Sequence, residues 1–166
     1  MRNPKRIEKF LERLDVPVLL ETMKKKFPIL SELDVDRRSA EIMSLINSKD
    51  FLSYWKDNPD LRFGQLLFNL NVGFMDAIYY DEESDILKLQ GLSNRQSIMW
   101  TSLLDSEGNR LAEPSVKFID ELDTSHLLKM IEEYAQDVRP YSEKIIKVFI
   151  EEIIVRNNNN PDISQM

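Results

Sequence analysis

Apolar residues recur at spacings of three and four positions along most of the chain, as they do in helices with one buried face. Asn3 and Ser48 precede two such stretches and can cap them, because short polar side chains accept hydrogen bonds from the first turn of a helix. The pattern predicts about seven or eight short helices, over residues 3–14, 17–26, 35–47, 49–57, 60–72, 84–90, 124–136 and 141–156.

Two shorter apolar stretches, 97–104 and 112–119, are typical of strands, and the residues between them favour a turn. Pro114 in the second stretch indicates an edge position, because proline has no N–H to donate. A third short strand is expected over 76–80. An isolated hairpin is only marginally stable, so its apolar face must pack against helices. The predicted fold class is therefore α+β, predominantly helical, with one β-hairpin.

The length of 166 residues and the hydrophobic content of 42% fit one compact globular domain with a buried core. We expect this domain to span residues 1–156. Its parts would be N-terminal helices over 1–47, a motif region over 48–91, and the hairpin with the C-terminal helices over 95–156. Residues 157–166 are polar and predict a flexible tail.

The segment Trp55–Leu70 is the densest concentration of aromatic, apolar and turn residues in the chain. Asp60 follows a turn and can cap the predicted helix over 60–72, which Gly73 would end. Gly64 weakens a helix by roughly 0.5–1 kcal/mol, so it indicates close packing by a neighbouring element. Trp55 and Leu67 are predicted core residues. The apolar face of the helix comprises Phe63, Leu66, Leu67, Leu70 and Phe74.

A polar strip, Arg62, Gln65 and Asn69, follows the same helical spacing on another face of this segment. Farther along, Asp81 and Glu82 belong to a group of carboxylates that also includes Glu83 and Asp85. Such a group can bind a divalent cation, but acidic residues before a helix also favour the positive end of its dipole. The loop lacks the glycine and the alternating spacing of a calcium-binding loop, so no metal is expected.

The pattern W-x-x-x-P-D-x-R-F-G-Q-L-L-x-N-L spans Trp55 to Leu70, and Y-Y-D-E-E follows at Tyr79 to Glu83. A second pattern runs from Trp100 through Gly108 and Leu111 into E-L-D-T-x-H-L, ending at Leu127. Together these segments resemble a family of small, uncharacterised phage and prophage proteins, over roughly residues 50 to 156. The family has no assigned activity, so the resemblance implies a biological context and no mechanism.

Charge and composition exclude several function classes. A net charge of −7 opposes non-specific attraction to nucleic acid or anionic lipid over the whole surface. The absence of cysteine excludes disulfides, thiolate metal sites and cysteine nucleophiles, and it fits a cytoplasmic protein. No apolar run approaches the roughly 18 residues that span a bilayer, so no membrane partner is expected.

Catalytic and cofactor signatures are also missing. His126 is the only histidine, and the adjacent Ser125 cannot face it as a catalytic triad requires. Asp123 is instead expected to cap the helix over 124–136 and to hold the imidazole in place. No glycine-rich phosphate loop is present. We therefore expect no enzyme activity, no catalytic residue, no cofactor and no metal.

The favoured hypothesis is a non-enzymatic interaction or regulatory protein that binds a host or phage protein, with self-association left open. The alternative is a nucleic-acid-associated regulator that uses the basic helix over 3–14 together with the polar strip. A carboxylate-metal hydrolase ranks third. The residues expected to form an interaction face are Arg62, Gln65, Asn69, Asp81, Glu82 and His126.

Overall fold

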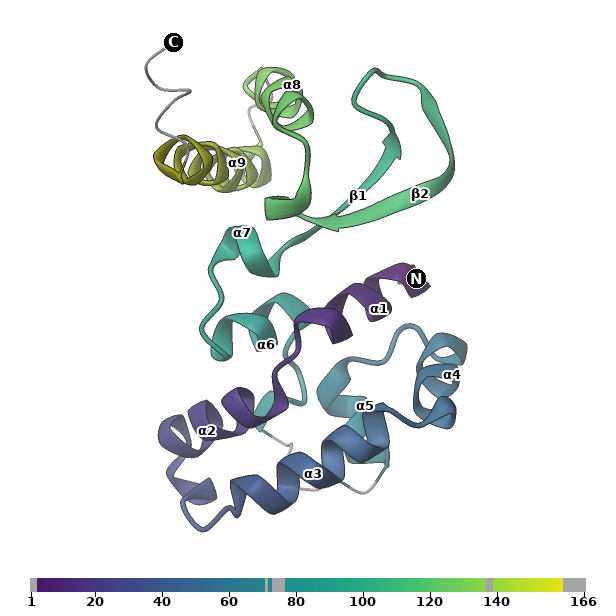
Figure 1. The fold of residues 1–166 in the computed structure, drawn as a ribbon, viewed down its shortest axis with the longest axis vertical. Coiled ribbons are helices and arrows are strands. Elements are labelled where there is room, and N and C mark those ends of the chain that lie inside the picture. The colour runs from purple at the N-terminus through teal and green to yellow at the C-terminus, as the bar shows by residue number, and fades with distance from the viewer. Residues whose placement is uncertain (1–2, 71, 73–76, 137–138, 160–166) are drawn as a thin grey trace. The chain divides into compact units, whose positions relative to one another are not determined.

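A computed structural model gives the fold (Figure 1) and describes residues 3–70, 72, 77–136 and 139–159. Within this described part, the chain forms nine α-helices and one two-stranded antiparallel sheet, which confirms the predominantly helical α+β class with one hairpin. Contacts between residues divide the chain into two compact units, Met1–Leu92 and Ser93–Met166. One globular domain over residues 1–156 stays a prediction.

The first unit is helical, and most of its helices begin and end close to the predicted positions. The side chain of Asn3 accepts a hydrogen bond from the N–H of Lys5 at 2.9 Å, and Ser48 accepts one from Phe51 at 3.3 Å. A short 3-10 turn lies at Pro28–Leu30. The helices are α1 (Pro4–Arg13), α2 (Val16–Lys26), α3 (Val35–Ile46), α4 (Lys49–Asp57), α5 (Phe63–Asn69) and α6 (Glu83–Leu89).

Aromatic rings form the centre of the first unit. Phe10, Phe51, Trp55 and Phe63 are almost fully buried, and neighbouring rings have centroids between 5.1 and 6.0 Å apart. The indole N–H of Trp55 donates to the carbonyl oxygen of Leu61 at 2.9 Å, so its polar atom is satisfied. Leu67 is also fully buried. The predicted core residues Trp55 and Leu67 are therefore confirmed, while Leu70 of the predicted apolar face is half-buried and Phe74 lies outside the described residues.

The second unit combines the hairpin with a helical layer. Its elements are α7 (Asn94–Ser97), β1 (Met99–Leu104), β2 (Arg110–Phe118), a 3-10 turn (Ile119–Glu121), α8 (Thr124–Tyr134) and α9 (Pro140–Asn159). The strands pair regularly from Met99↔Phe118 to Ser102↔Ser115. The register then shifts, so residues 111–114, which include Pro114, lie opposite Leu103 before Leu104 pairs with Arg110. The proline thus falls in an irregular part of the ladder.

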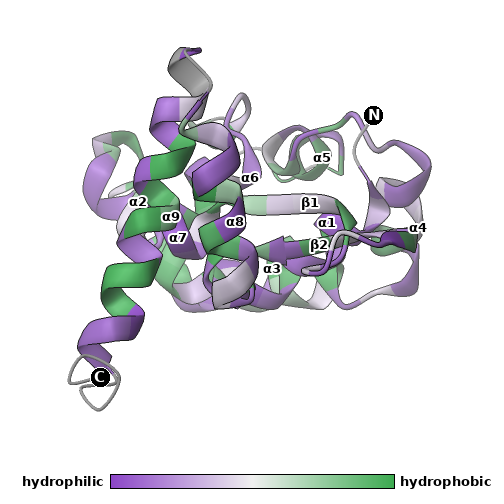
Figure 2. Ribbon diagram, turned by 90° about the horizontal axis from the view of Figure 1, so that it is seen from above, coloured by the Kyte–Doolittle hydropathy of each residue, from purple (hydrophilic) through white to green (hydrophobic). Residues whose placement is uncertain are grey.

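The helices α8 and α9 contact each other and bury one apolar cluster. In Figure 2, α9 carries green bands of hydrophobic residues between purple bands of hydrophilic ones, as expected for a helix with one buried face. Trp100 from β1 packs edge to face on Tyr134 and Phe149, at centroid distances of 5.8 and 5.3 Å. The cluster comprises Ile119, Leu122, Leu127, Met130, Ile145, Val148 and Phe149.

A charged network is also buried in this unit. The side chain of Glu152 on α9 is only 4% exposed and lies 2.9 Å from Arg95 and 2.8 Å from Arg156. Arg156 donates further hydrogen bonds to the hydroxyl of Thr124 and to the carbonyl oxygens of Asp120 and Leu122. These bonds attach the C-terminal part of α9 to the segment that precedes α8. The pattern of apolar residues gave no indication of this network.

Several predicted details are wrong. Helix α5 begins at Phe63, and Arg62 rather than Asp60 occupies its N-cap position. Residues 77–80 form a short helical turn instead of a strand, with the N–H of Asp81 donating to the carbonyl oxygen of Ile78 at 3.1 Å. Helix α9 continues to Asn159, past the predicted end at residue 156. Gly73 and residues 160–166 lie outside the described residues.

No helix in the described part of the chain is both long enough and apolar enough to cross a membrane.

Candidate interaction surface

The two halves of the Trp55–Glu83 pattern meet at Gly64 in the first unit. A Cβ atom at this position would lie 2.3 Å from the carbonyl oxygen of Ile78 and 2.9 Å from the Cα of Tyr79. Both atoms belong to the backbone, so they cannot rotate away as a flexible side chain could. Glycine is therefore required for the turn at 77–80 to rest on α5. This confirms that Gly64 marks close packing by a neighbouring element.

The polar residues of the predicted strip hold this arrangement in place. The Nε atom of Arg62 lies 2.9 Å from Oε1 of Glu82, which joins the start of α5 to the start of α6. The side chain of Gln65 accepts a hydrogen bond from the N–H of Arg62 at 3.0 Å and so satisfies a free donor at the helix start. The ion pair is partly exposed and contributes only about 0–1 kcal/mol, so its main effect is on geometry.

Three aromatic side chains of the first unit contact one another in a row, Phe68 with Tyr79 and Tyr79 with Tyr80. Tyr79 lies edge to face against Phe68 of α5 at a centroid distance of 5.6 Å, and against Tyr80 at 4.9 Å. Phe68 is 45% exposed and Tyr80 is 75% exposed. We call Phe68, Tyr79 and Tyr80 the aromatic patch. Asn69, the last residue of the predicted strip, is exposed beside Phe68 in the sequence.

Directly after Tyr80, the chain carries the carboxylates of Asp81, Glu82 and Asp85. Asp85 accepts a hydrogen bond from the N–H of Glu82 at 3.3 Å and caps α6. Burial raises the pKa of Asp81, and the nearby Asp85 raises it further, while Arg62 acts in the opposite direction. With Asp81, Glu82 and Asp85 around a single guanidinium, the local charge is negative. Among the described residues, no group of three or more His, Cys, Asp or Glu side chains is placed to hold a metal ion.

His126 lies on α8 of the second unit, where it is half-buried beside a cleft that β1 also lines. Asp123 occupies the N-cap position of α8 but makes no capping hydrogen bond with its side chain, so the expected cap is wrong. Arg156 holds this segment instead, through the carbonyl oxygens and the hydroxyl described above. Of the six predicted interaction residues, Arg62, Gln65, Asp81 and Glu82 lie together, Asn69 ends the same helix, and His126 belongs to the second unit.

The aromatic patch was not among the features predicted from the sequence. Phe68 lies off the apolar stripe of α5, on the polar side of the helix next to Gln65. An aromatic residue on the polar side of a helix indicates an exposed ring, so the sequence did contain a sign of this patch. Tyr79 and Tyr80 were assigned to a short strand over 76–80 because aromatic residues favour strands, and that assignment gave no information about their exposure.

Comparison of the chain with protein-family models, with curated proteins and with solved structures finds no match.

Proposed function

We propose that the chain is a non-enzymatic protein-binding module whose aromatic patch contacts a basic surface of its partner. The observation that supports this most strongly is the exposure of Phe68 and Tyr80. The backbone of the turn that carries Tyr80 is packed tightly against Gly64 of α5. Large aromatic side chains that remain in contact with water at a fixed position are typical of binding surfaces.

The patch is held in one arrangement before any partner binds. The backbone contact at Gly64, the Arg62–Glu82 ion pair and the ring contacts of Tyr79 all restrict the same turn. A surface ordered in advance loses little conformational entropy on binding, so more of the contact free energy contributes to affinity. Tyrosine and phenylalanine also supply a large contact area with only two side-chain torsions each.

The charge beside the patch indicates the chemistry of the partner. Asp81, Glu82 and Asp85 would attract lysine and arginine side chains and would repel an acidic surface. We therefore propose a partner with an apolar pocket or groove bordered by basic residues. The resemblance to phage proteins suggests that it is a phage or host protein, and that identity stays a prediction.

The nucleic-acid alternative receives less support from the same geometry. Aromatic rings can stack on bases, but the carboxylates beside the patch would repel the phosphate backbone. Arg62 of the predicted strip already pairs with Glu82. On the basic N-terminal helix, Lys9 pairs with Glu12 at 3.6 Å, and Glu8 pairs with Lys56 at 2.6 Å.

A capture experiment from a lysate of the producing cells tests the proposal. The tagged full chain is compared with the double variant Phe68→Ala and Tyr80→Ala, and with the control Ile29→Ala. Ile29 is 89% exposed in the same unit and is not part of the patch. Half of each lysate is treated with nuclease, and captured proteins are identified by mass spectrometry.

We expect a basic protein that the wild type and the Ile29→Ala control retain in both halves and that the double variant loses. Equal retention by all three proteins would contradict a role for the patch. Retention that disappears after nuclease treatment would favour the nucleic-acid alternative.

A further inference from the structure

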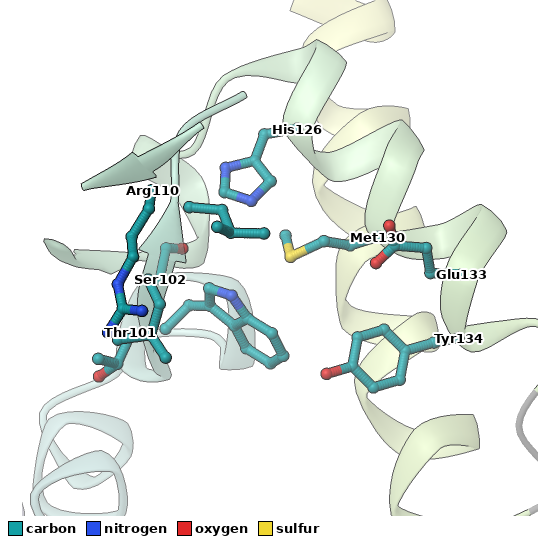
Figure 3. A pocket seen from close by; sticks show the side chains of 10 residues that line it. Thr101, Ser102, Arg110, His126, Met130, Glu133 and Tyr134 are labelled. Carbon is teal, nitrogen blue, oxygen red and sulfur yellow. The ribbon is translucent and has the colours of Figure 1, made fainter. Parts of the chain in front are cut away.

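The second unit contains a cleft between β1 and α8 that has no part in the proposed protein-binding surface (Figure 3). Its volume is about 480 Å³, within the range of pockets that bind small organic molecules. Residues 100–104 of β1 line the cleft on one side. On the other side, His126 and Met130 extend from α8.

Ser102 is the first feature that indicates a ligand. The residue is 8% exposed, and its buried hydroxyl oxygen has no hydrogen-bond partner among the described residues. Buried hydroxyl groups in proteins almost always have a partner, because leaving one without a partner costs free energy. Ser102 lines the cleft, so a molecule bound there can supply the missing partner.

Positive charge is available on the same lining. Arg110 pairs with Leu104 in the hairpin, and His126 lies in the first turn of α8. Within the described part of the chain, neither side chain has a hydrogen bond or an ion pair. The start of α8 adds the positive end of a helix dipole. Glu133, the acidic residue of the lining, lies about two helical turns farther along α8, roughly 10 Å away by the rise of an α-helix.

The remaining lining is apolar and suits a flat or branched hydrophobic group. Trp100 and Tyr134 stand edge to face at a centroid distance of 5.8 Å, and Met130 adds a flexible, polarizable side chain. Cleft walls of this kind bind the body of a small ligand, while a few polar groups set its orientation.

We propose that this cleft binds a small organic carboxylate with an aromatic or branched apolar body. The carboxylate accepts a hydrogen bond from the Ser102 hydroxyl, Arg110 supplies the positive charge that distinguishes it from a neutral molecule, and an N–H of the His126 ring can donate a further hydrogen bond. The apolar body lies against Trp100 and Met130. This inference does not rest on the proposed protein-binding function.

The first test is a titration of the ¹⁵N-labelled full chain, followed by NMR, with phenylacetate as the probe. Phenylacetamide, which is neutral, and phenethylamine, which is cationic, serve as matched probes with the same ring. We expect phenylacetate to shift the amide signals of residues 100–104 and 126–134 with a Kd of about 1 mM or tighter. The other two probes should bind about tenfold more weakly. An absence of shifts at these residues, or equal binding of the three probes, would overturn the proposal.

The second test uses substitutions on the lining. Ser102→Ala should leave Tm unchanged or raise it, because the hydroxyl has no partner in the free protein, and should weaken phenylacetate binding severalfold. Arg110→Gln should also weaken binding, whereas Lys144→Gln should not. Lys144 is an exposed residue of α9 outside the cleft lining, so it controls for the loss of one positive charge. If Ser102→Ala lowered Tm without changing affinity, or if both charge variants had the same effect, the proposed site would be wrong.

Discussion

The two units bury different kinds of side chain at their centres. In the first unit, Phe10, Trp55 and Phe63 interlock, and Gly64 lets the backbone of the turn at 77–80 approach α5. In the second unit, an apolar cluster is accompanied by Glu152, which is buried between Arg95 and Arg156. Glu83, at the start of α6, is also buried in the first unit. The ring cluster depends on shape and apolar area, whereas the Glu152 network depends on charges that must be paired.

This difference determines which changes each unit tolerates. A truncated ring leaves a cavity that close-packed neighbours cannot fill. An added methyl group at a backbone contact forces atoms apart. Removing one charge of a buried set is costly for another reason, because the remaining charges lose their partner while they stay desolvated.

The largest expected effect is in the aromatic core of the first unit. Trp55→Ala should lower the free energy of unfolding by about 3–5 kcal/mol, because it removes a fully buried ring and its hydrogen bond to Leu61. Tyr54→Ala is the matched control, since the neighbouring Tyr54 is exposed on the same helix. Urea denaturation measures both variants. Equal costs for the two would show that the core does not lie where α4 places Trp55.

The backbone contact at Gly64 should be nearly as sensitive. Gly64→Ala is expected to lower the free energy of unfolding by about 3 kcal/mol, although alanine favours helices more than glycine does. The new methyl group would overlap the carbonyl of Ile78. Asn69→Ala, an exposed change on the same helix, should stay within about 0.5 kcal/mol. A stabilised Gly64→Ala variant would mean that α5 and residues 78–79 do not touch.

The charged network of the second unit provides the next test. Glu152→Gln should lower the free energy of unfolding by about 2 kcal/mol, because Arg95 and Arg156 would lose their carboxylate partner while they stay partly buried. Glu151→Gln, at the exposed position beside it on α9, should change stability by less than about 0.5 kcal/mol. Denaturant melts of both variants against the wild type give the comparison. If Glu152→Gln and Glu151→Gln changed the free energy of unfolding equally, the second unit would not depend on its buried charge.

The hairpin turn should show a smaller effect that depends on pH. The N–H group of Asn109, helped by that of Glu107, donates to the Asp105 carboxylate and lowers its pKa in the folded protein. A carboxyl with a depressed pKa stabilises the fold above its unfolded value, about 3.9, and loses that contribution as the pH falls through the folded value. Asp105→Asn should therefore lower Tm at pH 7, and the gap to the wild type should close in acid.

Glu107→Gln is the control for this pH series, because it removes a charge from the same loop without removing the backbone bonds to Asp105. A gap for Asp105→Asn that stays constant from neutral to acidic pH would show that the carboxylate charge makes no contribution.

The helices and the hairpin could be predicted because their signals are local. Ile7 and Phe10 share one turn of a helix, Asn3 caps the residues directly after it, and the turn over 105–109 lies between two apolar stretches. The predicted strand at 76–80 was wrong because the preference of aromatic residues for strands depends on context and is easily overridden by tertiary contacts. A local pattern could not show that this segment must turn where it meets Gly64.

The candidate surface could be predicted only in part. The residues Arg62 and Glu82 were both selected, but their ion pair joins positions far apart in the sequence, and spacing carries no information about such pairs. The same holds for Glu152, whose partner Arg95 lies in a different helix. His126 was selected because it is the only histidine, and the structure places it on a cleft of the second unit.

Photo-crosslinking tests the aromatic patch most directly as a binding surface. Benzoylphenylalanine replaces Tyr80 in the full chain, or Ile29 in a matched control chain, and irradiation is done in the producing cells before nuclease treatment and mass spectrometry. We expect a basic protein to be crosslinked from position 80 and not from position 29. Crosslinks to nucleic acid at position 80, or the same proteins from both positions, would contradict a protein-binding role for the patch.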